Sequence, residues 1–196
     1  LVGSEMCIRD SLVKDIYLLV TEDTEVPLQG CQILHVPALN STATMRIIAA
    51  HSDADYTLFY IKYTTLKLGM FALERMTRIA EDSVAGMVYA DHYQVSEGIQ
   101  KNAPVIDYQF GSLRDDFNFG SVLLYKASAL QEAVTRMKTD YQFAGLYDLR
   151  LKLSQKESLV HINEYLYSEI ENDTRKSGEK IFDYVNPKNR GVQIEM

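Results

Sequence analysis

The sequence has no tryptophan, four prolines and only two cysteines among its 196 residues. Cys7 and Cys31 are too few for a disulfide framework and show no metal-ligand spacing, so a disulfide-rich scaffold and a cysteine zinc site are excluded. No apolar run approaches the roughly 20 residues that a membrane-spanning helix needs, and no signal-peptide pattern is present. We therefore expect a globular protein without a transmembrane segment in a reducing compartment, by default the cytoplasm.

Basic residues are also fewer than acidic ones. The chain carries 20 Lys and Arg against 27 Asp and Glu, a formal net charge of −7. This balance argues against nucleic acid or an anionic membrane as the main partner, because both attract basic proteins. A nucleotide ligand stays compatible with it, since a few local cations or helix N-termini can offset the overall sign.

Several catalytic signatures are missing as well. The chain contains no Gly-rich phosphate loop, no Gly-x-Ser-x-Gly elbow, and no His-Glu-x-x-His or Cys-x-x-Cys metal motif. A flavodoxin-like or Rossmann binding domain fits the strand and helix pattern described below, but it should carry the phosphate loop that this chain lacks.

What is present fits one domain with a proper core, because 46% of the residues are hydrophobic and 24% are charged. Short apolar, β-branched or aromatic runs predict six strands: Ile16–Val20, Gln32–Val36, Tyr56–Ile61, Gly86–Ala90, Ser121–Tyr125 and Leu159–Ile162. Helical spacing between them predicts four helices: one capped by Asn40 or Ser41 and running to Ala50, one through Leu73–Ala80, one at Ala129–Lys138 behind a Ser128 capping box, and one at Ala144–Ser154. Alternating strands and helices predict an α/β fold with a mostly parallel central sheet and helices on both faces.

The two ends of the chain differ in character from its middle. Residues 1–11 resemble a translated sequencing-adapter peptide and are set aside as an expected artefact. We expect the folded domain at residues 12–168. Residues 169–196 turn polar and charged, and we expect them to form a closing loop or a linker to a missing C-terminal domain.

Ligands of α/β sheets bind at the carboxyl ends of the strands, which directs attention to the residues after Ile61, Ala90 and Ile162. Asp91 and His92 follow Ala90 directly and are candidate substrate-binding residues, although adjacent residues on a strand point to opposite faces. The alternative is that Asp91 caps a turn and His92 is merely exposed. His161 ends the last predicted strand, where a lone histidine is more often a hydrogen-bonded core residue than a ligand.

Three segments together resemble family-2 glycosyltransferases: Met87–Tyr93, Tyr108–Tyr125 and Tyr141–Tyr184. The resemblance is closest to the N-terminal domain of two-domain family-2 glycosyltransferases from Bacteroidetes. It implies the Rossmann-like nucleotide-diphospho-sugar transferase fold, called GT-A. It also implies a nucleotide-sugar donor, a glycan or other hydroxyl acceptor, cell-surface polysaccharide synthesis, and a cytoplasmic location, with peripheral attachment to the inner membrane as an option.

The resemblance also implies roles for single residues. Asp148 corresponds to the last acid of the family's Glu-Asp-aromatic-Asp pattern and is the candidate catalytic residue, while Gly145 and Leu146 stand where the preceding Glu and Asp belong. Asp115 and Asp116 are candidate sugar-binding residues, and with Asp148 they are the candidate bases. The Asp-x-Asp metal pair is replaced by Ile61-Lys62-Tyr63, so no metal ligand is expected in this segment; Mn²⁺ or Mg²⁺ would belong to a second domain of the parent protein.

Two functions from different classes follow. The segment is either a transferase domain or a catalytically degenerate module that binds glycan or supports an adjacent active transferase domain. Asp148 separates the two, because a base is needed for turnover whereas a structural Asp148 would only brace its helix.

Overall fold

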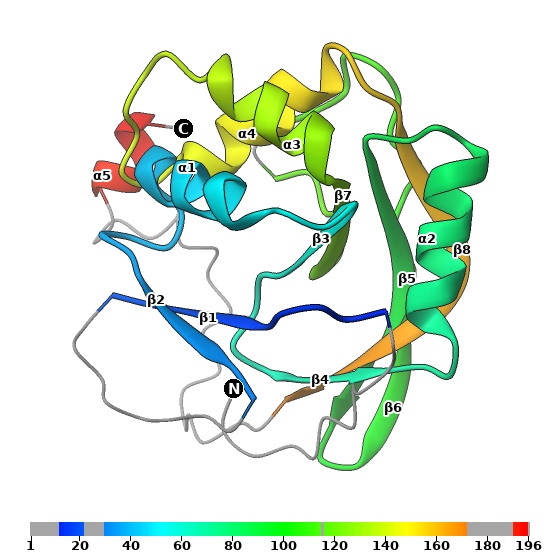
Figure 1. Cartoon of the computed structure of the whole chain (residues 1–196). Coiled ribbons are helices and arrows are strands. Elements are labelled where there is room, and N and C mark those ends of the chain that lie inside the picture. The colour runs from blue at the N-terminus through cyan, green and yellow to red at the C-terminus, as the bar shows by residue number, and fades with distance from the viewer. Residues whose placement is uncertain (1–11, 22–29, 115, 172–189, 196) are drawn as a thin grey trace.

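The computed structural model describes residues 12–21, 30–114, 116–171 and 190–195. In chain order the elements are β1 (Tyr17–Val20), β2 (Gln32–His35), α1 (Thr42–His51), β3 (Tyr56–Tyr60), β4 (Thr65–Leu68), α2 (Ala72–Asp82), β5 (Met87–Ser96), β6 (Ile99–Ala103), β7 (Val122–Lys126), α3 (Ala127–Thr135), α4 (Gly145–Ser154), β8 (Leu159–Glu171) and α5 (Arg190–Glu195). The fold is mixed α/β (Figure 1).

All six predicted strands are confirmed, with two additions and two extensions. β4 and β6 were not predicted, β5 continues to Ser96, and β8 continues to Glu171, three residues past the expected domain boundary at 168. Ser41 caps α1, because its side chain accepts a hydrogen bond from the backbone N–H of Thr44. The predicted Ser128 cap is wrong, since α3 already begins at Ala127 behind Lys126, whose side chain makes no cap.

The main sheet has six strands in the order β3-β7-β5-β8-β4, with β6 paired to β5. Only β5 and β8 pair in parallel; β3–β7, β7–β5, β8–β4 and β5–β6 are antiparallel. The prediction of a mostly parallel sheet is therefore wrong. One reason is the tight turn at Glu97 and Gly98, both at positive φ, which folds β6 back along β5 as a hairpin. β1 and β2 form a separate parallel pair.

Helices cover both faces of this sheet, as predicted (Figure 1). Odd-numbered residues of β5, such as Met87 and Tyr89, pack against α1, α3 and α4, whereas Val88 and Ala90 pack against α2. The two-residue period of strand side chains thus divides the core into two clusters. No helix in the described ranges is long and apolar enough to cross a membrane.

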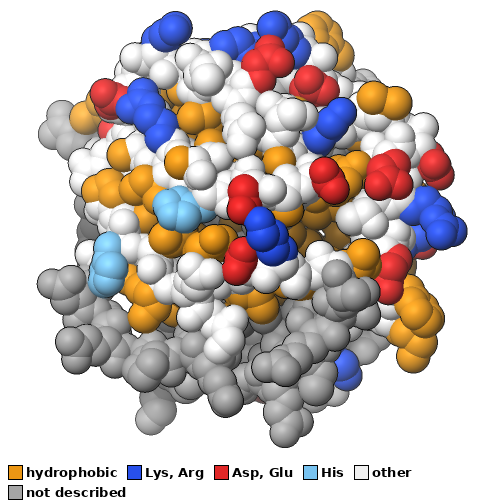
Figure 2. Space-filling model, in the orientation of Figure 1, with side chains coloured by type: hydrophobic (Ala, Val, Ile, Leu, Met, Phe, Trp, Pro, Cys, Tyr) orange, Lys and Arg blue, Asp and Glu red, His pale blue; other side chains and the backbone are white. Residues whose placement is uncertain are grey.

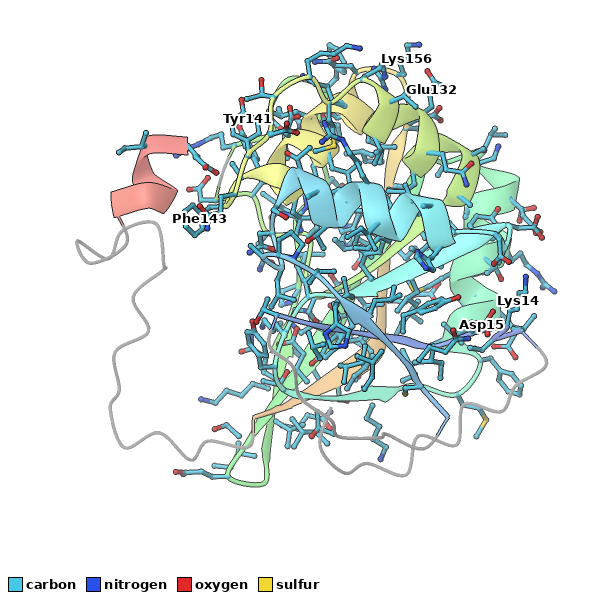
Figure 3. All side chains as sticks on the ribbon, turned by 60° about the vertical axis from the view of Figure 1, so that its left-hand side comes forward. Lys14, Asp15, Glu132, Tyr141, Phe143 and Lys156 are labelled. Carbon is cyan, nitrogen blue, oxygen red and sulfur yellow. The ribbon has the colours of Figure 1, made fainter. Side chains whose placement is uncertain are left out.

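Polar contacts join the helices at the rim of the larger cluster. Lys156 Nζ lies 2.7 Å from Glu132 Oε1 and ties the end of α4 to α3 (Figure 3). At the other end of α4, the Glu195 carboxylate of α5 accepts hydrogen bonds from the backbone N–H groups of Gln142, Phe143 and Ala144. Acidic and basic side chains intermingle on the face shown in Figure 2.

Candidate functional site

The carboxyl ends of three strands meet at one edge of the main sheet. β3 and β5 both run opposite to β7, and β8 runs parallel to β5, so these three strands share one direction. β7 lies between β3 and β5 and contributes its first residues to the same edge. This is the edge at which α/β sheets bind ligands, and it carries the buried polar side chains described next.

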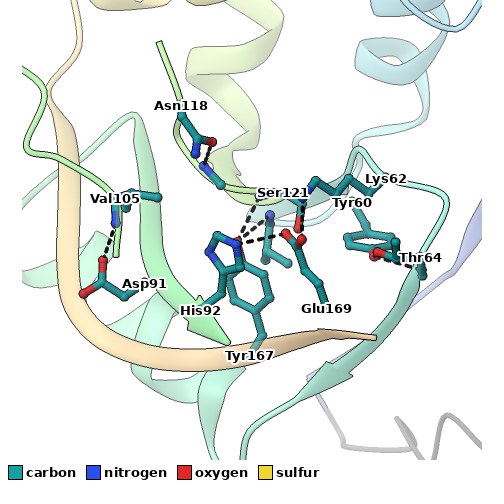
Figure 4. A network of polar contacts seen from close by, with 12 residues as sticks. Tyr60, Lys62, Thr64, Asp91, His92, Val105, Asn118, Ser121, Tyr167 and Glu169 are labelled. Atoms are coloured by element: carbon teal, nitrogen blue, oxygen red, sulfur yellow. Dashed lines mark hydrogen bonds and ion pairs between the residues drawn. The ribbon is translucent and has the colours of Figure 1, made fainter. Parts of the chain in front are cut away.

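Lys62, His92, Tyr167 and Glu169 form a group that we call the lysine cluster (Figure 4). Lys62 follows β3 and its ammonium contacts Glu169 Oε2. The other carboxylate oxygen of Glu169 lies 3.3 Å from His92 Nε2. The Glu169 side chain is only 1% exposed, and Lys62 supplies the opposite charge that a buried carboxylate needs.

Tyr167 fixes the geometry of the cluster. Its ring stacks on His92 at a centroid distance of 5.0 Å, and its hydroxyl accepts a hydrogen bond of 2.9 Å from the Ser121 backbone N–H (Figure 4). β8 is thereby attached to the start of β7, across the intervening end of β5. Gly120, at φ +78°, allows this approach, because a Cβ there would lie 2.5 Å from the Tyr167 hydroxyl.

Burial shifts the pKa of the cluster's histidine. It lowers the pKa of His92, an effect that the nearby Glu169 carboxylate partly offsets. Burial also raises the pKa of Tyr60, which precedes Lys62, to about 12. The Nδ1 atom of His92 and the Oγ atom of Ser121 are buried without a hydrogen-bond partner, so this edge contains polar groups that the described residues leave unsatisfied.

Asp91 and His92, predicted together, lie on opposite faces of β5. Asp91 belongs to a second group, the histidine bridge, in which His161 joins two carboxylates. His161 Nε2 lies 2.9 Å from Asp91 Oδ1, and His161 Nδ1 lies 2.6 Å from Asp107 Oδ1. The expectation that His161 is a buried, hydrogen-bonded residue is confirmed, and Asp91 caps a loop by accepting the Val105 N–H at 2.8 Å.

The predicted sugar-binding pair is only partly visible. Asp115 lies outside the described residues. Asp116 is at the surface, where its Oδ1 atom lies 3.3 Å from Arg114 Nε.

Asp148 lies in the first turn of α4, and its side chain is 10% exposed. Its Oδ1 atom lies 3.2 Å from Lys152 Nζ, one turn further along the helix. The neighbouring Leu146 packs against the larger core cluster. Asp148 therefore has an ion-pair partner on its own helix, whereas Asp91 and His92 are paired through strand β8.

Sequence reasoning missed the partners of these residues. The sequence places Glu169 in the expected linker. In the structure Tyr167 and Glu169 are both buried, as the two-residue period of a strand explains. Asp107 carried no signal, because a single acid in a loop is ordinarily solvated. Lys62 is recognisable in the sequence as the residue in place of the metal-binding acids, but its pairing with Glu169 is not.

The residues at this edge do not fit the Mn²⁺ or Mg²⁺ that the family resemblance implies. Such ions need several oxygen ligands, yet β3 is followed by Ile61, Lys62 and Tyr63, and Glu169 is already paired with Lys62. Across the described residues, no group of three or more His, Cys, Asp or Glu side chains is arranged to hold a metal ion.

Comparison with known proteins adds no assignment: no family model matches the chain, and no curated protein matches it in sequence.

Proposed function

We propose that this chain is the N-terminal transferase-like domain of a family-2 glycosyltransferase with the GT-A fold. The protein would transfer a sugar from a nucleotide-sugar donor to a glycan or other hydroxyl acceptor during cell-surface polysaccharide synthesis at the cytoplasmic side of the membrane. The observation that carries the proposal is the lysine cluster, which gathers a cation and unsatisfied buried polar atoms at the carboxyl ends of β3, β5 and β8.

The donor's diphosphate needs positive charge, both in binding and when it leaves. Lys62 supplies a fixed cation at the end of β3, and 42% of its side chain is exposed, so it is open to a ligand as well as to Glu169. A phosphate at this place would exchange one anionic partner of Lys62 for another. Binding of the donor by this domain should then not depend on a metal ion.

A second candidate function is a non-catalytic module that binds glycan or supports an adjacent transferase domain. The pairing of Asp148 with Lys152 favours it, since this carboxylate is engaged by a side chain of its own helix. The packing of Leu146 in the core favours it too, because the position expected to hold an acid contributes to stability instead.

Thermal unfolding of the 196-residue chain with UDP-, GDP- and dTDP-sugars tests the donor site. We expect one donor to raise the melting temperature of the wild-type protein, and Lys62→Met to abolish the rise. Lys67→Met is the matched control, because Lys67 is an exposed residue of β4 and should leave the rise intact. A shift that survives in Lys62→Met would remove Lys62 from the site, and a folded protein that no donor stabilises would favour the non-catalytic module.

A further inference from the structure

The segment Val105–Ser112 lies beside the histidine bridge and is held by side chains of β5 and β8. Asp91 accepts the Val105 N–H, and His161 contacts Asp107. The Tyr89 hydroxyl donates to the Ile106 carbonyl at 2.9 Å and accepts the Tyr108 N–H at 2.7 Å. Three side chains of the sheet thus fix four consecutive residues of a connecting loop.

The bridge holds a surface carboxylate in one orientation. Only 6% of the His161 side chain is exposed, and its ring stacks on the Tyr89 ring with 5.2 Å between the centroids. Its partner Asp107 is 84% exposed. An exposed carboxylate normally samples several rotamers, so its attachment to a buried and oriented imidazole is a form of preorganisation.

An aromatic ring is presented next to this carboxylate. Gln109–Ser112 forms a tight turn, closed by the Ser112 N–H bonded to the Gln109 carbonyl at 2.9 Å, with Gly111 at φ +83° as a type II turn requires. Phe110 occupies the corner of this turn and is 82% exposed. The Gly111 N–H donates to the Tyr108 hydroxyl at 3.3 Å, which ties the turn to the braced loop.

An exposed aromatic ring and an oriented carboxylate are complementary to a sugar. The apolar C–H face of a pyranose packs on an aromatic ring, and a carboxylate accepts strong hydrogen bonds from hydroxyl groups. Asp107 and Phe110 are three residues apart, so at most about 10 Å separates their Cα atoms, within reach of one or two sugar rings.

We propose that the segment Val105–Ser112 is a subsite for a neutral or amino sugar, in which Asp107 binds hydroxyl groups and Phe110 stacks on the ring. Identifying this sugar as the acceptor rests on the proposed transferase function; the sugar-binding site itself does not. Uronic acids are disfavoured, because their carboxylate would meet the Asp107 carboxylate. His161 is a positioning residue, since it acts on the sugar only through Asp107.

Saturation-transfer NMR on the 196-residue chain tests the subsite with methyl β-glucoside, methyl β-galactoside, methyl α-mannoside and methyl β-glucosaminide, and with glucuronate as the charged counterpart. We expect a signal from at least one methyl glycoside and none from glucuronate. Asp107→Asn and Phe110→Ala should each weaken binding at least tenfold without changing the melting temperature, because both side chains are exposed. The matched controls are Asp82→Asn and Ile99→Ala, which alter exposed residues elsewhere and should bind like the wild type.

His161 has its own test by rescue. His161→Ala should weaken glycoside binding, whereas His161→Asn should restore part of it, because the asparagine amide can donate to Asp107 from near the place of Nδ1. Equal losses in both variants would show that His161 serves only the fold.

The subsite is overturned if no methyl glycoside gives a signal, or if Asp107→Asn and Phe110→Ala both bind as well as the wild type. If no glycoside binds and Phe110→Ala changes self-association in sedimentation, the exposed ring is a protein contact instead. Loss of glycoside binding with donor binding intact contradicts the subsite alone. Glycoside binding without donor binding contradicts the transferase function alone.

Discussion

At the residue scale, the candidate site contains two buried carboxylates, and each is paired with two polar neighbours. Glu169 is held between Lys62 and His92, and Asp91 is held by His161 and the Val105 N–H. Each carboxylate is nearly inaccessible to water, so losing a partner leaves a charge that the protein interior stabilises poorly. The same pairing that stabilises the sheet edge therefore fixes the orientation of the groups a ligand would meet.

The lowered pKa of His92 makes stability depend on pH. The unfolded chain binds a proton at His92 near pH 6.5, whereas the folded protein binds it only at lower pH, so the unfolded state holds more protons in this interval. We expect the free energy of unfolding to be constant above about pH 7 and to fall as pH decreases below about 6.5. Urea unfolding between pH 5 and 8 measures this.

In the same experiment His92→Gln should flatten the pH dependence between pH 5.5 and 7, while His51→Gln, an exposed control on α1, should leave it unchanged. The charges of Glu169, Lys62 and Asp91 also influence His92. The comparison between variant and wild type therefore uses the slope of the unfolding free energy against pH and not its value at one pH. An identical slope in His92→Gln and wild type would contradict the assignment.

Asp148 allows the structural and catalytic hypotheses to be separated. Its ion pair with Lys152 is largely shielded from water and lies in the first turn of α4, where a negative charge is favourable. Asp148→Asn should lower the free energy of unfolding by about 1 kcal/mol. A double-mutant cycle with Lys152→Gln, followed by thermal unfolding, should show that the two losses are not additive. Additive losses would mean that the pair contributes nothing, and loss of transfer at full stability would make Asp148 the base.

At the element scale, packing explains why position 145 is a glycine and not the glutamate that the resemblance leads one to expect. Gly145 begins α4 where it crosses the start of α1, and a Cβ there would lie 2.4 Å from backbone atoms of Ser41 and Thr42. The Gly145 N–H also donates to the Asn40 carbonyl at 2.7 Å. With this helix crossing, the glutamate expected at position 145 has no room.

Gly145→Ala should consequently destabilise the protein by about 1–3 kcal/mol, the usual cost of overpacking, although alanine is the better helix former. Gly98→Ala is the control, because Gly98 has open space but lies at φ +76°, so its cost comes from the backbone alone. Denaturant unfolding of both variants measures the difference. A stabilised Gly145→Ala protein would show that α1 and α4 do not meet in this way.

Sequence patterns located most elements but not their directions. Apolar runs identified β7 and the first part of β5, where both faces are buried, and β3, which is half-buried and apolar. β6 reads Ile-Gln-Lys-Asn-Ala, is mostly exposed, and exists by pairing with β5, so it has no hydrophobic signal. Strand direction is set by connections and long-range pairing, which explains why the sheet is mostly antiparallel despite the alternating pattern.

The sequence likewise predicted where the candidate site lies but not which residues pair in it. The strand-end rule led to the neighbourhood of Lys62 and His92, and the strand period separated Asp91 from His92. Glu169 lies 107 residues after its partner Lys62, and Asp107 lies 54 residues before its partner His161, so no local pattern connects them.

At the scale of the whole molecule, the helices leave one edge of the sheet as the place for function. α1, α3 and α4 cover one face and α2 covers the other, while the shared carboxyl ends of β3, β5 and β8 carry the lysine cluster (Figures 1 and 4). With a net charge of −7, the protein would need such a local cation to attract the anionic donor that we propose.

Calorimetric titration of the 196-residue chain with UDP-, GDP- and dTDP-sugars, in Mn²⁺ and in EDTA, tests this most directly. We predict saturable binding of one donor with the same affinity in both buffers, because Lys62 stands in place of metal-binding acids. Binding that requires Mn²⁺ would contradict the role of Lys62, and the absence of binding by a folded protein would contradict a donor site in this domain.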